Sequence, residues 1–293
     1  MLLLALACTL PRVDRESFAV PMPLPYVPQD PVALLTHQAF ISGYAPVKVD
    51  GLINLDNPGA AGLDNEAVRV AIVVHALTHP THGTVYIDTG IPETLAVRGV
   101  GRLASRIIES VLPMSDIIAQ TGPPAAVFLT HTHADHILGL PDIPVGTPIY
   151  VGSGEWEPTG QGRGLLRRSI KATFGEHTFT ELAFTGPLGT MEGSFDVWGD
   201  GSLVVMPTPG HTPGSISMLA RTTQGGMLFV GDNSHTLWGW EHGVEPGGFT
   251  LDHEQNARNL VFLKDLAETV GLQVWVGHET DGVGTGISDE PAR

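Results

Sequence analysis

Short apolar runs alternate with glycine- and proline-rich turns along most of the chain, and the runs have the length of β-strands. Residues 68–77 are apolar and rich in β-branched side chains, and residues 83–88 follow after a turn of His, Pro and Gly. This pair predicts a β-hairpin. Similar runs predict strands at 125–130, 148–151, 180–184, 194–198, 202–206, 215–220, 227–230 and 273–276.

Helical spacing of apolar positions is clearest in residues 251–270, where Leu260, Leu263 and Ala267 fall on one face and Gly271 can end the helix. A second helix is predicted at 100–112, and a short third one at 116–120 with Ser115 as its cap. Runs of strands interrupted by a few helices favour layered sheets with helices outside, which is an α+β fold class.

The first 35 residues differ from the rest. Residues 9–35 carry six prolines and predict an extended N-terminal arm, whereas residues 36–293 read as one domain. Residues 1–8 are apolar and end in Cys8, which fits either the remnant of a secretory or lipoprotein signal or an N-terminus without a role. The first alternative implies a periplasmic or lipid-anchored protein and the second a cytoplasmic one. No transmembrane segment is expected. Residues 152–175 predict a flap rich in Gly and Arg.

Composition limits the chemistry. The formal net charge is −16 and no run rich in Lys and Arg occurs, so nucleic acid is not expected as a partner. Cys8 is the single cysteine, which excludes an intramolecular disulfide and a cysteine-based zinc site. With 13 histidines in the chain, any metal would be held by imidazoles and carboxylates.

Three histidines and one aspartate lie within six residues directly after a predicted strand. In an extended segment residues two apart point the same way, so His131 and His133 can face one ion. Asp135 and His136 follow where the chain turns and can face a second point nearby. This density of donors favours a metal site over a loop of surface histidines.

Three further donors follow predicted strands at a distance along the chain. His211 lies in a Pro-Gly-His-Thr-Pro-Gly turn, and Asp232 and His278 each follow an apolar strand through one glycine. Alone, each has a simpler interpretation, as a turn residue, a helix cap and a surface histidine respectively. Together with the histidine cluster they form a set, because a rigid scaffold presents ligands on loops at strand ends.

These segments together resemble the metallo-β-lactamase fold superfamily. The matching pieces are Asp88-Thr89-Gly90, Thr130-His131-Thr132-His133-Ala134-Asp135-His136, Pro209-Gly210-His211-Thr212-Pro213-Gly214, Gly231-Asp232 and Gly277-His278, in the family's order. They cover roughly residues 68–280. The resemblance implies a four-layer αββα sandwich with a dinuclear metal site, and it is much less informative about substrate because this fold hosts many reactions.

Carried over residue by residue, the resemblance implies two divalent metal ions per chain. One would be held by His131, His133 and His211, and the other by Asp135, His136 and His278. Asp232 would bridge them, and Asp88 would steady the ligand loops or serve only as a turn residue. Zinc is the expected metal, with iron, cobalt and manganese as alternatives.

Two metals about 3.5–4 Å apart can share a water and lower its pKa, and the resulting hydroxide can attack an electrophilic centre. Asp135 is expected to orient this nucleophile and move its proton. The expected function is therefore hydrolysis of a lactone or a related carboxylic ester by a metal-bridging hydroxide. Alternatives on the same site are a phosphotriesterase or arylesterase and a glyoxalase II-like thioesterase. A β-lactamase, a redox di-iron protein and a non-catalytic metal-binding relative fit the motifs less well.

Within the superfamily the resemblance is to N-acyl homoserine lactonases and related esterases, whose partner is a small-molecule ester or lactone and whose assembly can be a homodimer. True β-lactamases lack the bridging Asp232, and di-iron oxidoreductases carry Glu where His133 stands. Only 15 residues follow His278, so the C-terminal domain of glyoxalase II is not expected. Many lactonases have Tyr three residues after the bridging Asp, where this chain has His235. Either it donates a proton in catalysis or it is a solvent-facing loop histidine.

Other residues leave alternatives open. Trp156, Trp238 and Trp240 either line an apolar pocket or fill the edge of the core. His75, His79 and His82 cluster around the predicted hairpin turn, where a structural role is expected before an accessory metal site.

Overall fold

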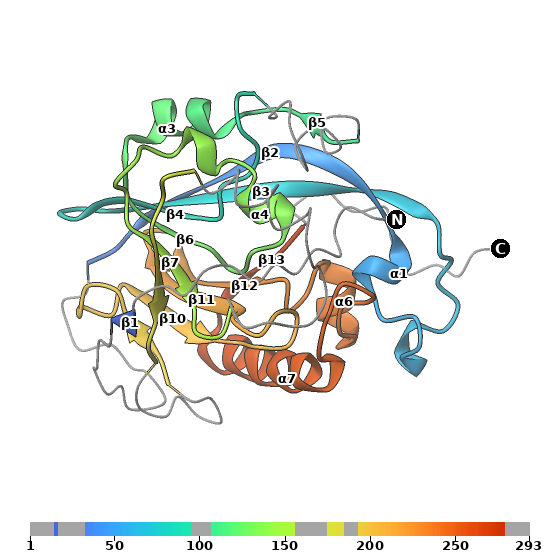
Figure 1. The fold of residues 1–293 in the computed structure, drawn as a ribbon. Helices are drawn as coiled ribbons and strands as arrows, with labels where there is room; N and C mark the ends of the chain where they lie inside the picture. Colours follow the sequence, from blue (N-terminus) through green and yellow to red (C-terminus); the bar gives the residue numbers. More distant parts are fainter. Residues whose placement is uncertain (1–14, 17–32, 95–106, 156–174, 185–192, 279–293) are drawn as a thin grey trace.

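Two β-sheets stack face to face, with helices on their outer faces (Figure 1). The computed structural model describes residues 15–16, 33–94, 107–155, 175–184 and 193–278. The larger sheet contains β1 Arg15–Glu16, β2 Thr36–Lys48, β3 Ala67–His79, β4 Gly83–Ile87, β5 Glu109–Ser110, β6 Pro124–Phe128, β7 Ile149–Gly152 and β8 Phe179–Leu182, in the order β1-β8-β7-β6-β4-β3-β2-β5.

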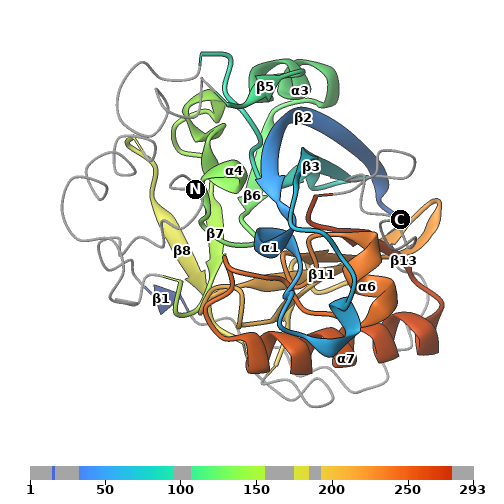
Figure 2. The same ribbon diagram turned by 90° about the vertical axis from the view of Figure 1, so that its right-hand side faces the viewer.

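The smaller sheet has the order β13-β12-β11-β10-β9, made of β9 Phe195–Asp196, β10 Leu203–Pro207, β11 Ile216–Thr222, β12 Gly225–Gly231 and β13 Gln273–Val276. The helices are α1 Val49–Leu52, α3 Met114–Thr121, α4 Ala134–Ile137, α6 Leu237–His242 and α7 His253–Val270, with short 3-10 turns at η1 Pro58–Ala60 and η2 Leu140–Asp142. Figure 2 shows α7 along the outer face of the smaller sheet, opposite α3.

Alternation of side chains along the strands builds three apolar layers. In β6, Phe128 points into the core between the two sheets, whereas Val127 points into the core beneath α3. In β12, Phe229 points to the core between the sheets and Leu228 to the core beneath α7. Both faces of each sheet are therefore covered, which confirms the predicted four-layer αββα sandwich.

Helix α7 shows how local sequence sets an element. The Asp252 side chain accepts a hydrogen bond from the backbone N–H of Gln255 and caps the first turn, and Gly271 ends the helix at φ 73°. Leu263 and Ala267, four residues apart, are buried against the smaller sheet. The helix was predicted correctly, except that it begins at His253 rather than at residue 251.

Residues 100–106 of the helix predicted at 100–112 lie outside the described range. Over the described residues, 107–112, the prediction is wrong. Glu109–Ser110 instead forms β5, an edge strand paired with Gly43 and Tyr44 of β2. Ile107 and Val111, two of its apolar positions, are 39% and 52% exposed. The helical spacing there did not reflect a buried face.

Two other local predictions need correction. Helix α3 begins at Met114 with Pro113 before it and has no side-chain cap, so Ser115 does not cap it. Strand β2 was not predicted, because its first half mixes exposed and half-buried positions and a bulge follows Ile41. The division of the chain at residue 35 stays a prediction. Leu35 itself is fully buried in the core between the sheets.

Most of the predicted flap, at residues 156–174, lies outside the described range, as do residues 1–14. Within the described range, no helix combines the length and the apolar character needed to cross a membrane.

Candidate metal centre

Strand direction brings the predicted donors to one end of the sandwich. In the larger sheet β4 and β6 are parallel, so Asp88 and the segment 131–136 emerge at the same edge. In the smaller sheet β12 is parallel to β13, and β10 runs the same way because both it and β12 pair antiparallel to β11. Their C-terminal ends lead to His211, Asp232 and His278. Ligands at the carboxyl ends of strands are therefore placed by topology.

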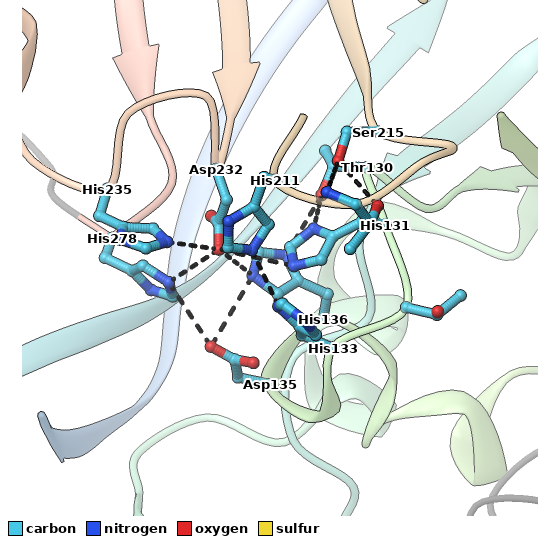
Figure 3. Close-up of polar contacts among 12 residues, drawn as sticks. Thr130, His131, His133, Asp135, His136, His211, Ser215, Asp232, His235 and His278 are labelled. Carbon is cyan, nitrogen blue, oxygen red and sulfur yellow. Dashed lines mark hydrogen bonds and ion pairs between the residues drawn. The ribbon is translucent and has the colours of Figure 1, made fainter. Parts of the chain in front are cut away.

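One carboxylate oxygen lies at the centre of the cluster (Figure 3). Five histidine Nε2 atoms lie within 3.5 Å of Asp232 Oδ2: those of His235 at 3.0 Å, His211 at 3.3 Å, His278 at 3.4 Å, and His131 and His136 at 3.5 Å. All of these side chains are buried. Five imidazoles around one buried carboxylate form a donor set suited to transition metals such as zinc.

The remaining donors complete three overlapping groups. His133 Nδ1 lies 2.8 Å from His211 Nε2. Asp135 Oδ2 lies 3.5 Å from His278 Nε2 and 3.7 Å from His136 Nε2. Ligand atoms within 4.8 Å of one another form the groups His131, His133, His211 and Asp232; Asp135, His136 and His278; and Asp232, His235 and His278. The structure thus brings together all seven predicted ligands.

Several buried polar atoms of these side chains have no hydrogen-bond partner among the described residues. They are Nε2 of His131 and His136, and Oδ1 of Asp135 and Asp232. A buried polar atom left unsatisfied is costly, so such atoms are rare unless they serve a function. Four such atoms within one buried cluster of His and Asp side chains fit cation coordination, and the residues present therefore fit a metal centre.

Asp88 anchors the segment 130–136, which carries the first three histidines of the centre. Its Oδ2 accepts hydrogen bonds from His136 Nδ1 at 2.7 Å and Thr130 Oγ1 at 2.8 Å, and its Oδ1 accepts from the Thr130 N–H at 2.7 Å. The residue sits in the left-handed region at φ 61°, which Asp tolerates better than most residues. In the neutral ring, whose Nδ1 hydrogen goes to Asp88, Nε2 of His136 carries the lone pair that a metal ion needs.

Three other rings are held at the outer nitrogen in the same way. His278 Nδ1 lies 2.9 Å from the Ala71 carbonyl oxygen, His211 Nδ1 3.2 Å from Thr250 Oγ1, and His131 Nδ1 3.1 Å from Thr130 Oγ1. The Ala71 carbonyl oxygen only accepts hydrogen bonds, so it fixes the tautomer of His278, whereas the threonine hydroxyls orient the rings of His131 and His211.

Burial keeps the imidazole rings of His131, His133 and His211 neutral. It lowers the pKa of His131 and His211 well below 6.5, and neighbouring histidines lower both further. Burial also lowers the pKa of His133 to about 4. Neutral imidazoles carry the lone pair that a metal requires.

The carboxylates reverse this effect on the other side of the cluster. Burial would lower the pKa of His136 and His278, but Asp232 and the other nearby carboxylates outweigh this effect. They raise the pKa of His136 well above 6.5 and that of His278 to about 9. Burial would raise the pKa of Asp232, yet the surrounding rings, led by His136, hold it well below 3.8. The field of the carboxylates stabilises positive charge at this point, which a bound cation also supplies.

Glu155 was not predicted and joins two ligand loops. Its Oε1 accepts from the Thr132 N–H at 2.7 Å, between His131 and His133, and its Oε2 accepts from Thr212 Oγ1 at 2.6 Å, next to His211. Burial raises its pKa, while these hydrogen bonds oppose the shift. Its partners lie 23 and 57 residues away, so no local pattern could have identified it.

An apolar wall borders the donors. Val47 at the end of β2, Leu52 of α1 and Phe249 line a hollow together with His133, Asp135, His211, Asp232, His235 and His278. Its volume of about 10 Å³ is that of one water-sized site. These three apolar residues were also missed, since the strand, the helix and the loop that carry them contain no motif.

His235 lies inside the centre and is not a solvent-facing loop histidine. It is 2% exposed, its Nδ1 lies 3.1 Å from the Leu52 carbonyl oxygen, and its ring is 5.3 Å from that of His278.

The remaining sequence candidates lie away from the donors. Trp238 and Trp240 pack in apolar clusters, and Trp156 lies outside the described residues. His79 Nε2 bonds Asp200 Oδ2 at 3.0 Å, and His75 Nδ1 lies 3.1 Å from His37 Nε2. Among the described residues these histidines join no group of potential metal ligands.

Comparison with known protein families agrees with this geometry. Residues 81–278, well over half of the chain, match the family model of the metallo-beta-lactamase superfamily. The chain belongs to the metallo-β-lactamase superfamily. This confirms the resemblance that the motifs suggested.

Two curated relatives are N-acyl homoserine lactonases. AttM of Azorhizobium caulinodans is 29% identical over 163 residues, which are 53% of this chain and 58% of the relative. A Bacillus sp. N-acyl homoserine lactonase is 28% identical over 218 residues, 70% of this chain and 80% of the relative. The match thus spans little more than half the length of the AttM relative.

Solved structures show the same fold. A quorum-quenching N-acyl homoserine lactone lactonase superposes with a TM-score of 0.66 at 19% sequence identity, covering 86% of this chain and 95% of that one. This superfamily member therefore shares its sandwich architecture with that enzyme.

Proposed function

We propose that this superfamily member is a metal-dependent hydrolase that opens lactone rings or cleaves related carboxylic esters. The observation that carries the proposal is the convergence of seven buried donors on one point, beside an apolar wall formed by Val47, Leu52 and Phe249. The N-acyl homoserine lactonases among its relatives support a lactone as substrate.

We further propose two divalent ions, with zinc as the first candidate and iron, cobalt or manganese as alternatives. His131, His133 and His211 would hold one ion, Asp135, His136 and His278 the other, and Asp232 would lie between them. When bound, such ions polarise a carbonyl oxygen and make water a better nucleophile at neutral pH. The imidazole-rich donor set is the reason for preferring zinc over magnesium or calcium.

The chain's own residues would position the substrate and handle a proton. Asp135 Oδ1 is buried without a hydrogen-bond partner among the described residues, so it can accept a proton or a hydrogen bond beside the reacting carbonyl. Val47, Leu52 and Phe249 would exclude water from the acyl side of the ester.

A substrate panel tests the activity. The zinc-loaded protein is assayed with N-acyl homoserine lactones of several chain lengths, simple γ- and δ-lactones, aryl esters, thioesters, phosphotriesters and β-lactams. The proposal expects the highest kcat/KM for lactones or carboxylic esters. Turnover confined to phosphotriesters, thioesters or β-lactams would contradict it.

Asp232→Ala tests the central carboxylate. The substitution removes the oxygen around which five imidazoles gather, so activity and bound metal should fall together, activity by at least about 100-fold. Asp200→Ala, at a carboxylate bonded to His79 outside the centre, is the matched control and should keep both. An active, fully metal-loaded Asp232→Ala protein would show that Asp232 holds no ion.

A further inference from the structure

Two histidines enter the metal centre from different loops with the same anchoring. His278 Nδ1 lies 2.9 Å from the Ala71 carbonyl oxygen, and His235 Nδ1 lies 3.1 Å from the Leu52 carbonyl oxygen. A carbonyl oxygen only accepts hydrogen bonds, so each Nδ1 carries the hydrogen. In a neutral ring the other nitrogen, Nε2, then carries a lone pair.

Nε2 of His235 faces Asp232 and the other donors (Figure 3). Its Nε2 lies 3.0 Å from Asp232 Oδ2, closer than Nε2 of His278 at 3.4 Å. One ligand atom from each of Asp232, His235 and His278 lies within 4.8 Å of the other two. His235 is also as deeply buried as the other rings, at 2% exposed.

We propose that His235 is itself a metal ligand, giving its Nε2 lone pair to the ion that His278 and Asp232 would hold. The inference rests on the metal centre of the proposed function. A histidine whose outer N–H is anchored to a carbonyl is arranged as metal-binding histidines generally are. With its hydrogen committed to Leu52, the ring has none left to donate to a substrate from Nε2, so the sequence-based expectation of a proton donor is replaced.

The proposal adds an imidazole to one of the two sites. That site would have His136, His235 and His278 as nitrogen donors beside its carboxylates. Removing the imidazole of His235 therefore weakens the binding of one ion and leaves the ion of His131, His133 and His211 in place. Loss of the side chains that merely anchor a ligand already costs about 10- to 100-fold in metal affinity, and loss of a ligand costs at least as much.

The test uses the cobalt-loaded full chain and proton NMR. Each ring bound through Nε2 gives an exchangeable Nδ1–H resonance shifted far outside the normal range by the paramagnetic ion. His235→Gln is expected to lose one such resonance and keep the others, while chelator competition shows one of the two cobalt ions bound about tenfold or more weakly. His177→Gln is the matched control, because His177 also bonds a carbonyl, that of Leu140, outside the centre.

The outcomes separate this proposal from the metal centre itself. A His235→Gln protein that keeps every shifted resonance and both affinities overturns the ligand role and leaves the centre intact. A wild-type protein without any shifted imidazole resonance overturns both.

A second measurement covers the case that His235→Gln does not fold. In the zinc-loaded wild type with ¹⁵N-labelled histidine, the ring of His235 should be protonated at Nδ1 only. A ring protonated at both nitrogens, paired as a cation with Asp232, would overturn the proposal.

Discussion

Single residues set how closely the donors approach one another. A Cβ atom at Gly277 would collide with Asp232 Oδ1, so only glycine allows the end of β13 to pass beside the central carboxylate. Gly139 has a similar place, because a Cβ there would collide with the Thr89 carbonyl next to Asp88. The glycine preceding His278 in the sequence therefore has a steric reason in addition to its role in a turn.

Asp88→Asn tests the anchoring of one donor. The amide keeps the size of the side chain but removes the negative charge of the carboxylate, whose Oδ2 accepts the hydrogen bond from His136 Nδ1. Zinc affinity should therefore fall about 10- to 100-fold. The measurement is competition with a chelator of known affinity. Asp196→Asn, at a carboxylate that accepts hydrogen bonds from the N–H groups of Gly199 and Gly201, is the control. Equal losses in both variants would show that the effect is general destabilisation.

At this scale the sequence was informative wherever a donor followed a strand within a short motif. All seven predicted ligands meet. Four of them stand one to four residues past the end of a strand, and the other three follow His131 within the next five residues. Val47, Leu52 and Phe249 carry no such signal, since their meaning arises only when β2, α1 and a distant loop come together. His235 was identified as a site residue, but its tautomer depends on the Leu52 carbonyl 183 residues away.

Loops are the elements that hold the centre, and Glu155 joins two of them. Glu155→Gln replaces one acceptor oxygen by an NH₂ group that faces existing donors, so at least one buried hydrogen bond to a charged group is lost. The free energy of unfolding should fall by roughly 2 kcal/mol or more. Zinc affinity should fall as well, because the loops at Thr132 and Thr212 are no longer tied together.

Thermal or chemical unfolding with chelator competition checks this prediction. Glu254→Gln, at an exposed side chain on α7, is the control and should leave both quantities unchanged. Wild-type stability and affinity in Glu155→Gln would contradict the role of Glu155 as a tie between the loops.

Element prediction succeeded where a strand is buried on both faces and failed at the sheet edge. Strands such as β6 and β12 were found because both faces pack against cores. The edge strand β5 was mistaken for helix, and β2 was missed because the first half of the strand mixes exposed and half-buried positions. Long-range pairing rather than local preference fixes these edges.

Over the whole molecule, burial of two histidines between the sheets links stability to pH. His37 Nε2 lies 3.1 Å from His75 Nδ1, and both rings contact Phe229 and Trp275. Burial lowers the pKa of His37 to about 4 and that of His75 well below 6.5. Since the unfolded chain binds these protons near pH 6.5 and the folded chain does not, stability should fall as pH drops from about 6.5 towards 4.

His37→Gln should reduce this loss, because one of the two groups no longer takes up a proton on unfolding. Unfolding curves of wild type and variant, recorded from pH 7.5 to 4.5 at the same metal loading, measure the difference. A constant offset in stability is irrelevant, since only the slope with pH matters. Parallel curves would contradict the assignment.

The proposed function depends most on two metal ions held at the C-terminal ends of the strands. Elemental analysis of the purified chain, expressed with added zinc and freed of loosely bound metal, tests this directly. We predict about two ions per chain, falling to one or fewer in Asp232→Ala. A wild-type ratio near one or zero would contradict it.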